Sequence, residues 1–211
     1  ILMDLMIDQT VNKAAEDYMK AMPDYAPKDF EWRLSASGKC PTLMDFEMLK
    51  GRKPFDFKGM LRTLRGTHLH TMWQEILSDL VTGQEGEVTL KLDSGREILG
   101  HYDGIIEQWD AVYELKNIGD FTYTKIVNQG APLAANIEQA NIYAYLLGRD
   151  NTLMHYFNTS SCDSVYFLIP TNKQLALETK QKWETREKVL EHKMIEPRPY
   201  QDPTLEPCWY C

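Results

Sequence analysis

The residues whose types and spacing have the clearest chemical meaning are Asp103, Glu114 and Lys116. Glu114 and Lys116 are two positions apart, so on a strand they share one face while Leu115 points into apolar packing on the other. Carboxylate oxygens are the ligands that hard divalent cations prefer, and an ammonium group beside them offsets negative charge. If Asp103 reaches the same face, the three side chains form a divalent-metal site with a cationic helper.

A β-hairpin would bring the two carboxylates together. Residues 97–107 have the pattern of a strand, 108–110 that of a turn and 111–116 that of a returning strand. With this register, antiparallel pairing sets Asp103 opposite Glu114. The glycines near Asp103 indicate a bulge, or the close approach of a ligand or another backbone. The competing interpretation is a cross-strand salt-bridge cluster on a solvated sheet face, which stabilises a fold little.

Four short motifs follow one another in an order and spacing that resemble a known family. They are Gly66-Thr67-His68-Leu69-His70, Gly100-His101-Tyr102-Asp103, Glu114-Leu115-Lys116 and Gln139-Ala140-Asn141-Ile142-Tyr143. From about residue 35 to its last residue, the chain resembles the RecB-like branch of the PD-(D/E)XK nucleases. That branch includes λ exonuclease and the CRISPR-associated RecB-like exonucleases with a four-cysteine cluster. The resemblance implies an α/β fold with a restriction-endonuclease-like core, in which helices flank a central mixed sheet.

Phosphodiester hydrolysis by such a core requires a divalent cation, Mg²⁺ or Mn²⁺. Asp103, Glu114 and the backbone carbonyl of Leu115 are the expected ligands. Lys116 would orient the attacking water or help to deprotonate it, and would offset charge in the transition state. A lysine that acts as a base needs a lowered pKa, which no sequence pattern reveals.

A histidine on the predicted helix over 58–81 is a further candidate ligand. Periodicity places His68 and His70 on opposite borders of the apolar stripe around Leu69 and Trp73, so it does not choose between them. The resemblance favours His70, because the family's Gly-Thr, two residues and a histidine end there. An imidazole ligand would shift the preference towards Mn²⁺. The alternative is an ordinary histidine at the surface.

Gln139 and Tyr143 are one turn apart on the helix predicted over 132–147, so one face presents both. The resemblance implies that they line the active site, where they contact substrate or support the catalytic lysine. Without the resemblance, the simpler interpretation is a pair on the helix surface.

The cysteines extend the resemblance to a second metal site. Cys208 and Cys211 have C-x-x-C spacing, which in a reducing compartment indicates metal binding rather than a disulfide. The cluster-bearing relatives use one cysteine before the core and three at the end to hold a [4Fe-4S] cluster. Cys40 fits the first position, but the last cysteine would lie beyond residue 211. A truncated chain, an incomplete site and a zinc site remain open, and Cys162 is interpreted as a loop cysteine.

The net charge of −8 argues against a protein that coats nucleic acid through bulk electrostatics. Between residues 50 and 66, however, the sequence contains six basic residues and only one acidic residue, with phenylalanines interleaved. This pattern suits phosphate contacts and base stacking, and a solvated loop and helix start explain it equally well. The candidate DNA-binding residues are Arg52, Lys53, Arg62 and Arg65.

A chain of 211 residues with 43% hydrophobic content can bury one good core. We expect a helical extension over 1–33, a nuclease core over 34–196 and a metal-cluster tail over 197–211. No apolar run is long enough for a membrane span or a signal peptide, so we expect a soluble, cytoplasmic protein. Further predicted elements are a helix of about ten residues after Pro41, strands at 87–92 and 164–170, and a charged helix at 173–193 with i,i+4 pairs such as Glu178 with Lys182.

Together these patterns predict a metal-dependent DNA exonuclease that acts on single-stranded or end-exposed DNA. A site-specific endonuclease of the same superfamily is one alternative. A non-cleaving module that binds DNA ends or acts as an adaptor is another. The complete set of Asp103, Glu114 and Lys116 speaks against that module, because a pure binder has no need of three metal-site residues.

Overall fold

A computed structural model describes residues 13–14, 16–18, 21, 32–51 and 57–192. A four-stranded sheet has the order β3-β4-β5-β6, and a separate two-stranded sheet pairs β1 with β2. The strands are β1 (Gly86–Lys91), β2 (Glu97–Tyr102), β3 (Gly104–Ile106), β4 (Ala111–Ile118), β5 (Asn151–Asn158) and β6 (Ser164–Pro170). β4 and β5 run parallel and the other neighbours antiparallel, so the central sheet is mixed.

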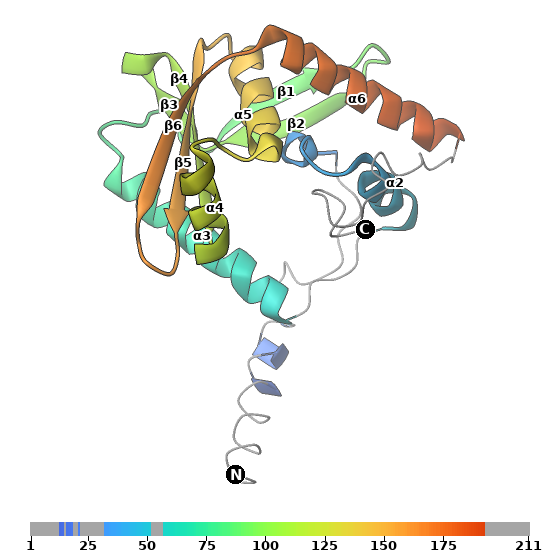
Figure 1. Cartoon of the computed structure of the whole chain (residues 1–211). Helices are drawn as coiled ribbons and strands as arrows, with labels where there is room; N and C mark the ends of the chain where they lie inside the picture. Colours follow the sequence, from blue (N-terminus) through green and yellow to red (C-terminus); the bar gives the residue numbers. More distant parts are fainter. Residues whose placement is uncertain (1–12, 15, 19–20, 22–31, 52–56, 193–211) are drawn as a thin grey trace.

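Helices cover both faces of the four-stranded sheet (Figure 1). The helical elements are η2 (Leu34–Ala36), α2 (Pro41–Lys50), α3 (Phe57–Ile76), η3 (Glu107–Trp109), α4 (Asp120–Gln129), α5 (Ala134–Leu146) and α6 (Lys173–His192). Leu69 and Trp73 of α3 pack against one face of the sheet, while Ile126 of α4 and Ala140 of α5 pack against the other. β4 and β5 are therefore buried on both sides, as parallel strands between helical layers usually are.

The predicted hairpin has the expected register but is interrupted at one residue. Gly104 pairs with Tyr113 and Ile106 with Ala111, which is the pairing that sets Asp103 and Glu114 at the same level. The predicted strand over 97–107 is split, because β2 leaves for the second sheet and Asp103 lies in the gap before β3. The turn is the short helix η3.

The glycines beside Asp103 are explained by close packing of the protein itself. A Cβ on Gly100 would lie 2.6 Å from the ring of Tyr143, and one on Gly104 would overlap the side chain of Val81. Both positions therefore admit no side chain without movement of a packed neighbour.

Several element boundaries differ from the predictions. α3 ends at Ile76 rather than near residue 81, and α5 begins at Ala134, so Pro132 precedes the helix instead of occupying its first turn. Gly148 follows the end of α5 with a φ of 65°, as expected of a glycine that ends a helix. α4 and β5 have no counterpart among the predicted elements.

The charged helix α6 is less solvated than its i,i+4 pattern predicted. Lys182 pairs with Glu138 of α5 at 2.6 Å, rather than with Glu178. Arg186 reaches the fully buried Asp45 of α2 at 2.9 Å. α6 is therefore tied by charge to two other helices. None of the described helices is long and apolar enough to cross a membrane.

Candidate active site

Glu114 lies in the middle of β4 and is only 1% exposed. Its Oε2 accepts hydrogen bonds from the Lys116 ammonium at 3.0 Å and from the Gln139 amide of α5 at 3.3 Å. Among the described residues, its other oxygen, Oε1, has no hydrogen-bond partner although it is buried. This burial excludes the interpretation of a salt-bridge cluster on a solvated sheet face, and it leaves one carboxylate oxygen available to a ligand.

Burial and neighbouring charges shift the pKa values of Glu114 and Lys116 in opposite directions. Burial raises the pKa of Glu114 to about 7, although the neighbouring Lys116 ammonium works against that increase. For Lys116, burial alone would lower the pKa, but the charges of Glu114 and Asp103 outweigh it and raise the pKa. In the protein without bound metal, Lys116 is therefore a cation rather than a base.

Asp103 is fixed from two sides in the gap between β2 and β3. The backbone N–H of Leu115 donates to its Oδ2 at 2.6 Å, and Nδ1 of His70 lies 3.4 Å from its Oδ1. Burial would lower the pKa of His70, but the hydrogen bond and charge of Asp103 prevail and raise it. His68 is exposed on the other side of α3. The structure therefore brings His70 to Asp103 and leaves His68 in solvent.

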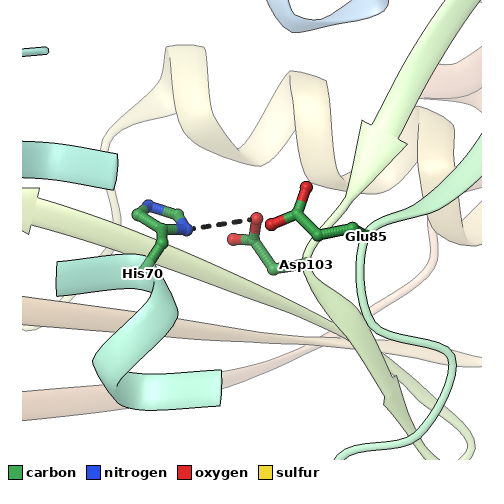
Figure 2. A group of neighbouring side chains, drawn as sticks. All are labelled: His70, Glu85 and Asp103. Carbon is green, nitrogen blue, oxygen red and sulfur yellow. Dashed lines mark ion pairs between the residues drawn. The ribbon is translucent and has the colours of Figure 1, made fainter. Parts of the chain in front are cut away.

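A third ligand-bearing residue, which sequence analysis did not single out, joins His70 and Asp103. Glu85 comes from the loop between α3 and β1 and points towards the other two residues (Figure 2). One potential ligand atom from each of the three residues lies within 4.8 Å of the others. Among the described residues, Glu114 is not part of this group, although Leu115, next to it on β4, binds Asp103.

Gln139 and Tyr143 are buried on α5 rather than exposed as a surface pair. The Gln139 amide that contacts Glu114 also lies 3.4 Å from the Tyr143 hydroxyl. Burial raises the pKa of Tyr143 well above its usual value, so the hydroxyl keeps its proton. The two side chains thus form a short polar path from the buried carboxylate into α5.

No known family model and no curated protein sequence matches this chain. In fold it is similar to the alkaline exonuclease LHK-Exo from Laribacter hongkongensis, with a TM-score of 0.59 and 16% identity over 80% of this chain and 92% of that chain. The structure of LHK-Exo in complex with dAMP has a TM-score of 0.55 and 15% identity, over 77% of this chain and 92% of that chain. The structure of a protein named SSO0001 has a TM-score of 0.58 and 16% identity, over 92% of this chain and 89% of that chain.

The chain shares the fold of these exonuclease structures. Its central mixed sheet is flanked by helices, as predicted, and the α/β fold class is confirmed. At such low identity the likeness concerns fold alone, and it leaves function to be argued from the site.

The predicted DNA-contacting residues fall partly on α3. Arg62 and Arg65 are exposed there, before His70 on the same helix. Arg52 and Lys53 lie outside the described residues. The two arginines that can be located therefore stand on the helix that contributes to the site.

The predicted cluster is described at only one of its cysteines. Cys40 is buried immediately before α2, and Cys162 is exposed in the loop between β5 and β6. Cys208 and Cys211 lie outside the described residues. The iron-sulfur or zinc site, like the division into domains, stays a prediction.

Proposed function

We propose that this chain is a divalent-metal-dependent deoxyribonuclease of the RecB-like type, which removes nucleotides from single-stranded or end-exposed DNA. The observation that carries the proposal is the Oε1 atom of Glu114, buried without a hydrogen-bond partner among the described residues. A buried polar atom without a partner costs roughly 1–3 kcal/mol. Such an atom beside Lys116 and near Asp103 is explained if it serves as a metal ligand.

The residues present fit a hard divalent cation. Asp103, Glu114 and the backbone carbonyl of Leu115 would supply oxygen ligands, and His70 would supply a nitrogen that suits Mn²⁺ better than Mg²⁺. When bound, such an ion lowers the pKa of water and stabilises charge on the phosphate. The hydrogen bond from Leu115 to Asp103 at 2.6 Å fixes one carboxylate against the strand that carries the other.

Lys116 would act as a cation during cleavage. Its ammonium is held 3.0 Å from Glu114, so it can donate to an attacking water or to a phosphate oxygen from a fixed position. Without bound metal, the charges of Glu114 and Asp103 raise its pKa and keep the ammonium protonated. Gln139 would hold the Glu114 carboxylate in orientation, and Tyr143 would support that amide.

Basic residues on and before α3 would bind the DNA. Exposed Arg62 and Arg65 on α3, together with Arg52 and Lys53, would bind backbone phosphates beside an otherwise acidic protein. LHK-Exo, whose fold this chain shares, has a structure in complex with dAMP. A nucleotide of that kind would be the expected product here.

A structural cluster would complete the proposal. Cys40, Cys208 and Cys211 would be ligands of a [4Fe-4S] cluster that ties the tail to the start of the core. Cys40→Ser should remove the visible absorbance of the cluster and Cys162→Ser should not. A colourless protein with stoichiometric zinc would replace the cluster with a zinc site.

A nuclease assay tests the central proposal. End-labelled single-stranded DNA, linear duplex and closed circular duplex should be incubated with Mg²⁺, Mn²⁺ or EDTA, with Asp103→Asn as the inactive control. We expect release of nucleotides from the linear substrates with either ion and none with EDTA. Cleavage of the closed circle would favour the endonuclease. Binding of ends without cleavage would favour the adaptor module.

A further inference from the structure

The loop between α3 and β1 brings a second carboxylate to His70 and Asp103 from a part of the chain that no motif covers. Glu85 is exposed, yet its carboxylate turns inwards, so that one potential ligand atom from each of the three residues lies within 4.8 Å of the others (Figure 2). Ligands around one octahedral ion at the usual metal–oxygen distance of about 2.1 Å are separated by no more than about 4.2 Å. Small side-chain movements would therefore let one cation contact all three.

A hydrogen bond holds Glu85 in this orientation. The side-chain amide of Gln74 donates to Glu85 Oε1 at 2.5 Å. Gln74 lies one turn beyond His70 on α3, so the helix that carries the imidazole also directs the carboxylate. The Gln84 amide in turn donates to the backbone carbonyl of Gln74 at 2.9 Å. The loop is thus attached to α3 by two contacts at the level of the site.

The arrangement has costs that a cation would offset. Glu85 has a φ of 53°, in the left-handed region, which costs a residue other than glycine roughly 1 kcal/mol or more. Its carboxylate also faces that of Asp103, and like charges at this separation repel. The next residue, Gly86, has no room for a side chain, because a Cβ there would overlap the ring of Tyr102.

We propose that Glu85 is a direct ligand of the divalent cation, together with His70 and Asp103, and that Gln74 positions it. This inference rests on the proposed function, which supplies the cation. Two carboxylates and one imidazole form a donor set that suits Mn²⁺. Glu85 would thereby add a ligand from outside the hairpin to the set formed by Asp103, Glu114 and Leu115.

Mn²⁺ binding in the absence of DNA tests the role of Glu85. In a titration of the whole chain with Mn²⁺, the electron paramagnetic resonance signal measures the unbound ion. The titration therefore yields the Kd for Mn²⁺ without any cleavage reaction. Glu85→Asn removes the charge, and asparagine tolerates a left-handed backbone better than glutamate does. We expect the Kd for Mn²⁺ to rise roughly tenfold or more, as for loss of a metal-site residue. The melting temperature without metal should stay equal or rise.

Glu87→Gln is the matched control, because Glu87 is an exposed glutamate on β1 whose contact is with His101 at 3.3 Å. It should leave Mn²⁺ binding unchanged, and an equal loss there would overturn the proposal. Gln74→Ala should weaken binding less than Glu85→Asn and add nothing in the double variant, because Gln74 acts through Glu85.

Two results separate this inference from the function on which it rests. If Asp103→Asn abolishes Mn²⁺ binding while Glu85→Asn leaves the Kd unchanged, Glu85 is not a ligand and the proposed function stands. If the wild-type chain fails to bind Mn²⁺ at millimolar concentration, both proposals are overturned.

Discussion

The two faces of the central sheet each bury a titratable side chain, and they treat it differently. On the face towards α3, His155 of β5 is fully buried with both ring nitrogens hydrogen-bonded, Nδ1 to the Tyr113 hydroxyl at 2.7 Å and Nε2 to Ser164 Oγ at 2.9 Å. The Trp73 ring meets it edge-on at 4.6 Å. On the face towards α5, Glu114 is just as buried, but one of its oxygens has no hydrogen-bond partner among the described residues.

This difference separates a structural polar group from a functional one. Burial lowers the pKa of His155 to about 4 and raises that of Glu114 to about 7, so both positions disfavour the charged form. His155 gains complete hydrogen bonding in return, and its loss should mainly affect folding. Glu114 retains an oxygen that no described residue hydrogen-bonds and that a bound cation would complete. Substitution of Glu114 should therefore lower the cleavage rate and leave stability without metal unchanged or higher. Substitution of His155 should lower stability and leave the cleavage rate little changed.

The largest effect is expected from the carboxylates and the lysine. Asp103→Asn, Glu114→Gln and Lys116→Ala should each lower the cleavage rate roughly a thousandfold, because the two carboxylates would hold the cation and the ammonium would offset negative charge in the transition state. Glu114→Gln should leave the melting temperature without metal unchanged or higher, since a neutral amide replaces a carboxyl whose ionisation burial opposes. Single-turnover kinetics and thermal unfolding in EDTA measure the two quantities.

The three losses should not add, because the residues act as one unit. The double variant Asp103→Asn with Glu114→Gln should be about as slow as either single variant. Near-normal cleavage by Glu114→Gln at saturating Mg²⁺ would contradict the distinction between the two faces.

His155→Leu should show the reverse behaviour. It leaves the Tyr113 hydroxyl without its buried partner, which should cost roughly 1–3 kcal/mol of unfolding free energy at neutral pH. The cleavage rate per folded molecule should change little. Urea unfolding together with kinetics on the folded fraction tests both expectations.

The same variant should alter the pH dependence of stability. In the folded wild type His155 stays neutral to about pH 4, whereas in the unfolded chain it takes up a proton near its ordinary pKa of 6.5. This contribution is therefore fully present above pH 6.5 and is lost as the pH falls towards 4, by about 3 kcal/mol in all. The difference in stability between wild type and His155→Leu should shrink over that range. A constant difference would show that His155 is not held neutral.

The hairpin could be predicted from sequence because its information is local. The turn and the alternation of side chains fix the register, so Asp103, Glu114 and Lys116 follow from one short stretch. β5 was missed because it is buried on both faces and therefore lacks alternation. α4 was missed because its threonines, isoleucine and valine are weak helix formers, and it is stabilised by Ile126 packing on the sheet.

The rest of the site depends on packing between distant elements. Glu85 reaches Asp103 only because α3 lies on the sheet and its loop returns at the right level, and neither periodicity nor a motif signals that. α3 itself ends early, since Leu77 and Leu80 continue the apolar stripe as a turn that packs into the core. Lys182 likewise pairs with Glu138 of another helix rather than with Glu178 of its own helix.

A smaller effect is expected at His70 of α3, which lies 3.4 Å from Asp103. His70→Ala should lower the cleavage rate roughly tenfold or more with Mn²⁺ as the only ion, and less with Mg²⁺, because nitrogen ligands favour the transition metal. His68→Ala should leave both rates unchanged, since His68 is exposed. Parallel rate measurements with each ion test this expectation. Equal losses from the two variants would indicate general damage to α3.

The smallest effect concerns the polar path behind Glu114. Gln139→Ala removes one of the two donors to Glu114 Oε2, so the carboxylate should lose orientation and the cleavage rate should fall by roughly tenfold. Tyr143→Phe removes a hydroxyl that accepts from the Gln139 amide at 3.4 Å and from the backbone of His101, and it leaves the ring that packs against Gly100. Its effect on the rate should be smaller than that of Gln139→Ala. The reverse order would mean that the Tyr143 hydroxyl, rather than the amide, contacts the substrate or its water.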